Sequence, residues 1–553
     1  MTIDTAAHHD RAPIELPHRV RMEILWAVLL GIFLAALDQT IVGTALPKIV
    51  TDLQGNDVYV WAFTAYLLTA TVSGPIYGKL SDIFGRRPIF IIGVSVFLAG
   101  SILCGISGTM WQFLLFRGIQ GLGAGALFPI ALAIIGDIFS PSERGKYQGF
   151  FGAVFGVSSL IGPAIGGIIT DTVGWHWIFF VNVPIGAVVL LVIWRTLPTH
   201  REPGADRHID YAGAALLVAA LVPILIGFTN KQFGEWTDAS VGGFILAGLA
   251  LAAAFVWVES RAHEPIVPLG LFRIRTFTSS VIAMFLAAMG FFAAIVFLPR
   301  WFQVVDGASA TESGYQILPL LGGLIVSAIL TGQVVARTGR YKGLIAVALV
   351  VTAFGLFLLT NIRPDTPTPL LWLWMAVTGL GVGPTFAVFT LAVQNAVPVR
   401  SLGAATSSLT LFQQVGGTVG LAITGTIFAS TLLDEVKPQM IAAGVPAAFA
   451  NQMPVDASSF NELTSVGDLG AAILAQVPEQ FRATVEPMVP AIVEGIHRAF
   501  SLATAGTFLV GIVTALLAAL TVLVVMPAGR MGEREERAGA AATGSGTAPD
   551  VAS

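Results

Sequence analysis

Charged residues are scarce in this 553-residue chain. They make up 11% of it, against 55% hydrophobic residues, and this leaves too little polar surface to cover a soluble globule of that size. The composition therefore excludes a soluble enzyme or binding domain and indicates an integral membrane protein. The net charge of −4 is small and names no partner, so no nucleic acid is expected to bind.

Cysteine is almost absent, and the usual cofactor motifs are missing. Cys104 is the one cysteine and lies in an apolar run, so no disulfide framework is expected. No Gly-x-x-x-x-Gly-Lys-Ser/Thr phosphate loop occurs, which argues against an ATP-driven pump. His263 and Glu264 begin a zinc-protease-like string, but Pro265 follows and Val267 replaces the second histidine. We expect no metal, no other cofactor and no enzyme, a membrane-embedded enzyme being the less favoured rival.

Apolar runs fill most of the chain. Fourteen of them approach the length of about 20 residues that a membrane-spanning helix needs: 24–46, 58–79, 88–107, 110–139, 146–170, 175–197, 210–230, 239–259, 276–302, 313–336, 342–361, 368–396, 403–432 and 498–526. Lys and Arg collect in short cytoplasmic loops. If the chain starts inside, 21 basic residues fall inside and 7 outside, and Arg117 lies within a run. We predict fourteen transmembrane helices, both termini in the cytoplasm, and a bacterial inner (plasma) membrane.

The chain divides into five expected parts. They are a cytoplasmic tail, a six-helix bundle, a two-helix insert with its flanking loops, a second six-helix bundle and a disordered tail, covering residues 1–23, 24–200, 201–275, 276–526 and 527–553. The second bundle includes an outer loop, 433–497, with eight acidic and two basic residues. This loop is either a solvated acidic cap or a set of short helices on the outer surface.

A short turn between the second and third runs recurs 254 residues later. Glycines and arginines at 78, 85 and 86 have counterparts at 332, 339 and 340, but Ala336 stands where the first turn has Asp82. Glycines let two helix ends approach, and an aspartate accepts hydrogen bonds from a helix N-terminus. Two related turns imply two six-helix halves around an inserted pair, 210–259, with a substrate site where the halves meet.

Two charged residues interrupt apolar runs. Asp38 lies nine residues before Pro47, at the outer end of the first run, and Arg117 lies seven residues after Met110, at the outer end of the fourth. At 1.5 Å per residue both lie roughly 10 to 14 Å below the outer ends, so we expect them to meet. Gln120 shares the face of Arg117. Charged residues inside the membrane usually mark a transport or proton pathway. The alternative is a purely structural role, in which Arg117 binds backbone carbonyls and takes no part in proton transfer.

Five segments together resemble the major facilitator superfamily. Residues 78–88 match its signature loop, 117–125 its fourth-helix motif, and 152–167 the fifth-helix motif of its antiporters. Residues 37–47 and 175–186 are similar to the first-helix and sixth-helix signatures of the 14-helix drug:proton antiporter branch. The match covers nearly the whole chain. It departs at Gly43, where the branch often has asparagine, and at Ala336.

The resemblance implies an all-α major facilitator fold and a proton-coupled exporter of amphipathic small molecules, a multidrug efflux antiporter. The resemblance links proton coupling to Asp38 and Arg117, and Gln120, on the face of Arg117, extends this polar set. The family's cytoplasmic gate corresponds to Gly78, Asp82, Gly85, Arg86 and Arg87, and Asp137, at the cytoplasmic end of the fourth run, is the expected partner of the loop arginines. The alternative is that the charged residues of this set have no gating role and are ordinary cytoplasmic loop charges, which follow the enrichment of Lys and Arg on that side. The family's fifth-helix motif corresponds to Gly152, Gly156, Gly162, Pro163, Gly166 and Gly167. Small residues at this spacing let helices pack closely, which is already a structural explanation. The resemblance adds that this packing between the halves prevents proton leak.

Aromatic residues are numerous, and most should face lipid. The candidates for lining a substrate cavity are Phe33, Trp61, Tyr66, Phe291, Phe297, Trp301, Phe386, Phe412, Gln413 and Gln414. The expected partners are an amphipathic substrate, protons and the lipid bilayer, and the expected state is a monomer. The alternative function is a dedicated exporter of one metabolite, lipid or siderophore.

Overall fold

The chain is helical throughout the part that can be described. The structure is a computed structural model that describes residues 16–54, 61–199, 209–231, 234–398, 401–453, 469–477 and 479–528, and within these ranges it contains no strand. Apolar runs of this length form helices because a helix satisfies its backbone hydrogen bonds internally, as the membrane hydrocarbon requires. The predicted all-α fold is confirmed.

The helices fall into three groups along the chain. The first comprises α1 (His18–Asp52), α2 (Trp61–Phe84), α3 (Arg86–Gly105), α4 (Met110–Ile138), α5 (Pro141–Thr172), α6 (Trp177–Phe180) and α7 (Asn182–Thr196). The second comprises α8 (Tyr211–Asn230), η2 (Ala239–Gly243) and α9 (Phe244–Glu259). The third comprises η3 (Leu269–Arg273), α10 (Arg275–Val305), α11 (Ala310–Gln316), α12 (Leu318–Thr338), α13 (Lys342–Leu359), α14 (Thr368–Ala396), α15 (Leu402–Ala442), α16 (Ala447–Gln452), α18 (Leu469–Gln476), α19 (Glu479–Val485), η5 (Glu486–Met488) and α20 (Val489–Val525).

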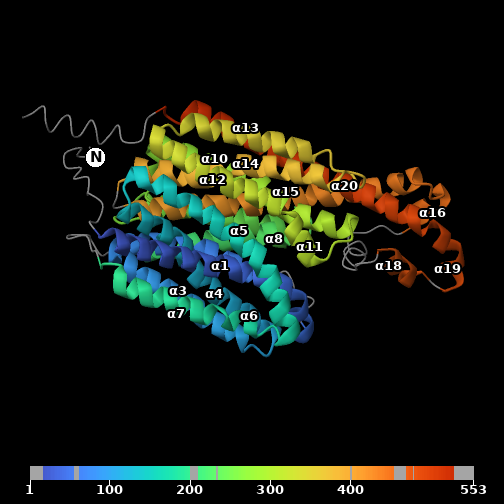
Figure 1. Cartoon of the computed structure of the whole chain (residues 1–553), viewed down its shortest axis with the longest axis horizontal. Coiled ribbons are helices and arrows are strands. Elements are labelled where there is room, and N and C mark those ends of the chain that lie inside the picture. The colour runs from blue at the N-terminus through green and yellow to red at the C-terminus, as the bar shows by residue number, and fades with distance from the viewer. Residues whose placement is uncertain are drawn as a thin grey trace, which may run out of the picture.

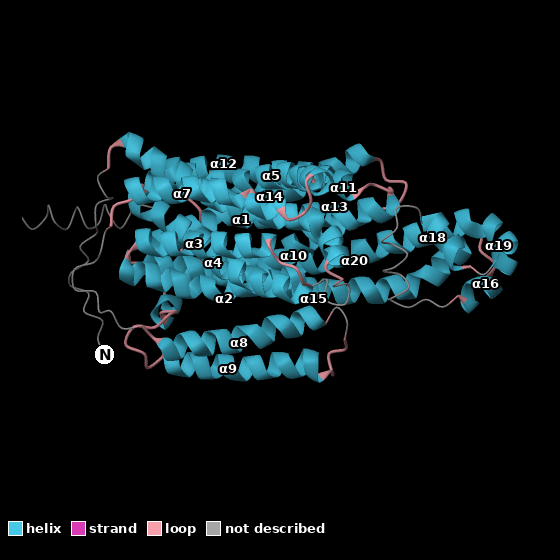
Figure 2. Ribbon diagram, turned by 90° about the horizontal axis from the view of Figure 1, so that it is seen from below, coloured by secondary structure: helices cyan, strands magenta, loops and turns pink. Residues whose placement is uncertain are grey.

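The first and third groups are two bundles that lie side by side. In Figure 1 the blue to cyan helices of the N-terminal bundle lie below the yellow to orange helices of the C-terminal bundle. Contacts between the bundles run mainly from α2 to α15 and from α5 to α12. The pair α8 and α9 packs on itself and touches α2 and α15 through α8, and Figure 2 shows it as a separate layer.

The two ends of the bundles differ in composition. One end, which we call the basic end, carries the α2–α3 and α12–α13 turns with Arg86, Arg87, Arg337 and Arg340. Gly85 and Gly339, with φ of 94° and 67°, make these two turns. The other end, which we call the cap end, carries α16, α18 and α19 (Figure 1).

Twelve helices of the described part are long and apolar enough to cross a membrane. They correspond to twelve of the fourteen predicted spans. The remaining two predicted spans fall on α2 and α5, which have 24 and 32 residues. Gly, Ser and Thr make up much of α2, and these residues lower its mean hydropathy. The multi-pass architecture is thus established, while the count of fourteen is not confirmed.

The cap end differs from the predicted loop 433–497. The helix predicted to end at 432 continues to Ala442, and the helix predicted to begin at 498 begins at Val489. Short helices occur between them, and their apolar residues join those of α15 and α20 in one core that includes Val436, Met440 and Ile473. The bounds predicted for the loop are therefore corrected, while the short helices agree with the second of the two forms predicted for this segment. Residues 454–468 lie outside the described part.

Candidate functional site: two buried polar clusters

Asp38 of α1 and Arg117 of α4 meet inside the N-terminal bundle. The Arg117 Nη1 donates to Asp38 Oδ2 at 2.7 Å, and the two side chains are 0% and 1% exposed. The sequence predicted this contact because the two residues lie at similar depths along their helices, and the structure places them together. Removing one partner of such a buried pair costs about 3 to 5 kcal/mol, because the other charge is left buried and uncompensated.

Further amide groups complete the surroundings of Asp38. We call Asp38 and its partners the proton cluster, after the proton-coupling role that the sequence predicts for Asp38, Arg117 and Gln120. Gln120 Nε2 and Asn182 Nδ2 both donate to Asp38 Oδ1, at 2.8 and 2.9 Å. Gln120 Oε1 accepts from Arg117 Nη1 at 2.6 Å, and Asn182 Nδ2 also lies 2.9 Å from Ser101 Oγ. Four helices, α1, α3, α4 and α7, therefore converge on one carboxylate.

Arg117 has two more neighbours. Its guanidinium carbon lies 4.3 Å from the centre of the Tyr66 ring, and its Nε donates to the Ala62 carbonyl at 3.4 Å. Among the described residues, Arg117 Nη2 and Asn182 Oδ1 are buried without a hydrogen-bond partner. One hydrogen-bond donor and one acceptor are thus left without a partner beside Asp38. Of the ion pair, only Asp38 can change its protonation, since arginine stays protonated.

Small residues let the helices approach closely enough to build the proton cluster. A Cβ at Gly121 would collide with the Tyr66 carbonyl of α2, and a Cβ at Gly100 of α3 would collide with the Gln120 backbone. Side chains at these two positions would push α2 and α3 away from α4. The glycines of α4 therefore have a packing reason that is independent of any ligand.

A second cluster joins the two bundles at the basic end, and we call it the gate cluster after the role that the sequence predicts for Asp82 and Arg86. Asp82 at the end of α2 accepts the N–H of Gly403 at 2.9 Å and that of Ala404 at 2.8 Å. These N–H groups belong to the first turn of α15, where a helix has unsatisfied donors. The Ser401 that precedes α15 makes no side-chain cap. Asp82 therefore caps a helix of the other bundle, and a carboxylate there is favoured by the helix dipole.

Arg86 holds Asp82 in this position. It donates to Asp82, to Ser81 Oγ at 2.7 Å and to Asp137 Oδ2 at 2.9 Å. The predicted partnership of Asp137 with a loop arginine is therefore present. Arg87 is placed differently, since it binds the Trp194 carbonyl and Thr199 at the end of α7 and does not join the gate cluster.

Close backbone packing accompanies these bonds. A Cβ at Gly78 would collide with Ser407 and with the Gly403 carbonyl of α15. Two more hydrogen bonds cross between the bundles near this end: Arg144 donates to Asn395 at 3.4 Å, and Gln394 donates to the Leu132 carbonyl at 2.9 Å. The bundles are therefore fastened together at the basic end.

The second copy of the repeated turn has Ala336 in place of the aspartate. The helix that packs along α12 is α5, and it begins with its own capping box, in which Ser140 and Glu143 satisfy each other's backbone. The first turn of α5 is therefore capped by residues of its own bundle, unlike the first turn of α15.

The small residues of α5 serve two neighbours. Cβ atoms at Gly162 and Gly166 would meet α1 at Thr40 and Ile41, inside the same bundle, whereas one at Gly156 would collide with Ile325 of α12. The Pro163 ring lies near Gly314, while Gly167 has open space around it. Contact with the other bundle thus rests on Gly156 and Pro163. Gly152 lies in α5, but its surroundings fall outside the described residues.

The aromatic candidates are dispersed. Trp301 is fully buried and donates to Ser501 at 2.9 Å, and Phe297 packs on Phe428 in the same core. For these two residues, cavity lining stays a prediction. Phe33 and Trp61 pack half-buried on the N-terminal core, and Tyr66 lies under Arg117. Phe412 packs against Phe272. Gln413 is half-buried, and Gln414 accepts a hydrogen bond from Thr71 across the bundles.

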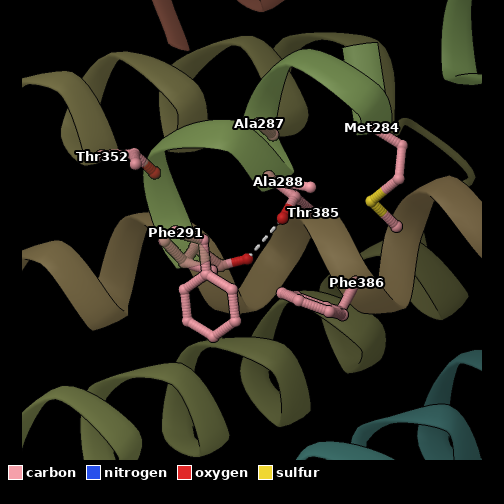
Figure 3. Close-up of a pocket in the computed structure, with 8 residues that line it drawn as sticks. Met284, Ala287, Ala288, Phe291, Thr352, Thr385 and Phe386 are labelled. Carbon is pink, nitrogen blue, oxygen red and sulfur yellow. Dashed lines mark hydrogen bonds between the residues drawn. The ribbon is translucent and has the colours of Figure 1, made fainter. Parts of the chain in front are cut away.

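Two aromatic candidates line a small pocket inside the C-terminal bundle. Phe291 of α10 and Phe386 of α14 lie with ring centres 5.2 Å apart. Thr385 donates to the Val382 carbonyl at 2.6 Å, which is the dashed line in Figure 3. The lining residues are Met284, Ala287, Ala288, Phe291, Thr352, Val382, Thr385 and Phe386. Most of the wall is apolar, so the pocket suits an apolar group.

Some residues of the two clusters escaped the sequence argument. Asn182 and Ser101 bind Asp38 or its neighbour, and the first turn of α15 binds Asp82. The available signal for Asn182 was an amide within an apolar run, but the sequence does not show towards which neighbour it points. Among the described residues, no group of three His, Cys, Asp or Glu side chains is placed to hold a metal ion.

Comparisons with known proteins agree with this architecture. The Major Facilitator Superfamily model matches residues 28–421. The multidrug transporter protein MdtP of Bacillus subtilis (strain 168) is 36% identical over 490 residues, 87% of this chain and 90% of that protein. Multidrug resistance protein 3 of the same organism is 36% identical over 503 residues, 90% and 94% of the two chains. A solved structure of a double tryptophan mutant of XylE is similar in fold, with a TM-score of 0.59 at 14% identity, over 94% of this chain and 98% of that one.

Proposed function

The chain belongs to the major facilitator superfamily, and from this premise we propose that it is a proton-coupled antiporter that exports amphipathic small molecules. It is a multi-pass membrane transporter and not an enzyme, as the family and the named relatives show. The observation that carries the coupling proposal is the buried proton cluster, in which one titratable carboxylate is paired with a permanent cation. Multidrug relatives at 36% identity support a broad substrate range.

We propose that the basic end faces the cytoplasm. Lys and Arg are enriched in cytoplasmic loops, and the turns at this end carry Arg86, Arg87, Arg337 and Arg340. We count fourteen spans by adding α2 and α5, because α2 packs along α4 and α15, and α5 packs along α1 and α12. With the gate cluster formed, the basic end is fastened, and on this orientation we propose that the conformation is closed to the cytoplasm.

Topology gives the first expected result. A cysteine at Asn451, exposed at the cap end, should react with a membrane-impermeant thiol reagent in intact cells. A cysteine at Ala528, beyond α20, should react only after the cells are opened. The native Cys104 is buried and gives the background. Equal labelling of both positions in intact cells would contradict a membrane crossing by α20, which lies between them, and with it the proposed count of fourteen spans.

We propose that exchange works through the proton cluster. Asp38 is ionised while it is paired with Arg117, and it takes up a proton when movement of α1 and α4 separates the pair. Substrate and proton then alternate in one transport cycle, because the carboxylate must give up its proton for the pair to re-form. Gln120 and Asn182 keep Asp38 in place while its partner changes.

Substrate range gives the second expected result. Expression in a pump-deficient host should raise the inhibitory concentration of several chemically unrelated dyes, quaternary ammonium compounds and antibiotics by about fourfold or more. An uncoupler that collapses the proton gradient should remove the efflux of ethidium. Protection against one compound class alone would favour the dedicated exporter, and efflux that survives the uncoupler would contradict proton coupling.

A further inference from the structure

The two-helix insert lies at the seam between the bundles. Its helix α8 touches α2 of the N-terminal bundle and α15 of the C-terminal bundle, and these are the two helices that the gate cluster joins. Figure 2 shows α8 between its partner α9 and the row that contains α2 and α15. At the basic end the insert shares an apolar core with α2, in which Leu217, Phe255 and Ile266 pack near Ile76.

The connector that follows α9, residues 260–268, is fixed by a buried carboxylate. Glu259, the last residue of α9, is 2% exposed. Its Oε1 accepts the N–H groups of Ile266 and Val267 at 3.1 and 3.4 Å. The side chains of Ile266 and Val267 are buried in the shared apolar core. The backbone of the connector is thus held from both sides, and the position of Glu264 within it is set.

Glu264 reaches from this connector to the end of α2. Lys79 Nζ donates to Glu264 Oε2 at 2.6 Å, and the two side chains are 11% and 32% exposed. Lys79 follows Gly78, whose Cα faces Ser407 and the Gly403 carbonyl of α15. The last turns of α2 are therefore held on one side by the first turn of α15 and on another side by the insert.

We propose that Lys79 and Glu264 are positioning residues, through which the insert holds the end of α2 in the place where Asp82 caps α15. The connector fixes Glu264, Glu264 fixes Lys79, and Lys79 sets where α2 ends. Asp82 lies three residues after Lys79, about one helical turn along α2. The insert therefore stabilises the state closed to the cytoplasm. This role rests on the proposed transport cycle, but its geometric part can be measured without any substrate.

The test is a mutant cycle with two readouts. Lys79→Gln, Glu264→Gln and the double variant are purified, with Lys79→Arg as the variant that keeps the charge. Spin labels at Arg195 of α7 and Thr338 of α12, both exposed at the basic end of different bundles, report the distance between the bundles. Transport in liposomes gives kcat and KM. Glu235→Lys is the matched control, because the exposed Glu235 lies at the other end of the insert, 3.7 Å from the largely buried Lys231.

Each single neutral variant should shift the distance distribution towards the separated state and lower kcat about three- to tenfold, with KM changed by less than about twofold. The double variant should equal a single one, because both act through one contact, and Lys79→Arg and Glu235→Lys should resemble the wild type. Unchanged distances in the single variants, or additive effects in the double variant, would overturn the proposal. The single variants could shift the distance without substrate while the wild type shows no proton-coupled transport. That result would support the positioning role and refute the antiport function.

Discussion

Asp38→Asn should abolish substrate transport driven by a proton gradient while substrate binding is retained. The substitution keeps the size of the side chain and removes the one group of the proton cluster that can release a proton. Transport should fall by at least about tenfold, to the background of empty vesicles. The measurement is ethidium uptake into inverted membrane vesicles, with binding to purified protein followed by fluorescence anisotropy.

Two comparisons separate coupling from simple damage. Asp52→Asn changes a carboxylate of the same helix, where Asp52 accepts from Trp175 at 3.1 Å near the cap end, and it should keep transport. Arg117→Lys should be less harmful than Arg117→Ala if a positive charge is the main requirement, although lysine lacks the forked donors that serve Asp38 and Gln120 together. Asp38→Asn that fails to bind substrate would point to misfolding, and gradient-driven transport that survives in Asp38→Asn would contradict the coupling role.

Asp82→Asn should leave the protein expressed and should release the closed basic end. The variant removes the charge that two N–H groups of α15 and Arg86 share. Hydrogen bonds to a charged group contribute about 1.5 to 3 kcal/mol each, so a loss of roughly 2 kcal/mol would change the ratio of closed to open states about thirtyfold. Transport should fall about tenfold or more, because the cycle needs both states.

The labels at Arg195 and Thr338 also give the measurement for Asp82. The distance between them should increase in Asp82→Asn without substrate. Asp137→Asn is the matched control and should have a smaller effect, since Arg86 keeps its bonds to Asp82 and Ser81. If Asp82→Asn keeps full transport and an unchanged distance, Asp82 is an ordinary loop charge and not part of a gate.

The sequence predicted a contact correctly where only the position along the helix axis had to be known. Depth along a helix is fixed by a rise of 1.5 Å per residue, and that sufficed to expect Asp38 beside Arg117. Rotation about the helix axis is not fixed in the same way for a helix that is apolar on all sides. Asn182 and Ser101 were therefore missed, and the sequence did not show that Trp301 would be buried in the core of the C-terminal bundle.

Contacts between distant segments were the other limit. The residues that Asp82 caps lie 321 and 322 positions further along the chain, and nothing in the first turn of α15 marks it as uncapped. Arg86 and Arg87 are neighbours of the same type, yet only Arg86 faces Asp82, because successive residues of a helix point about 100° apart. The insert likewise reads as two plain apolar helices, and its link to α2 depends on one lysine and one glutamate.

The measurement that tests the account most directly is proton movement caused by substrate in liposomes that contain a pH-sensitive dye. Wild-type protein should move protons when ethidium is added, and Asp38→Asn should move none, although it still binds ethidium. An undiminished proton flux in Asp38→Asn would contradict the central claim. The search for the proton site would then move to Asp137 in the gate cluster or to Glu312, which caps α11 near the cap end.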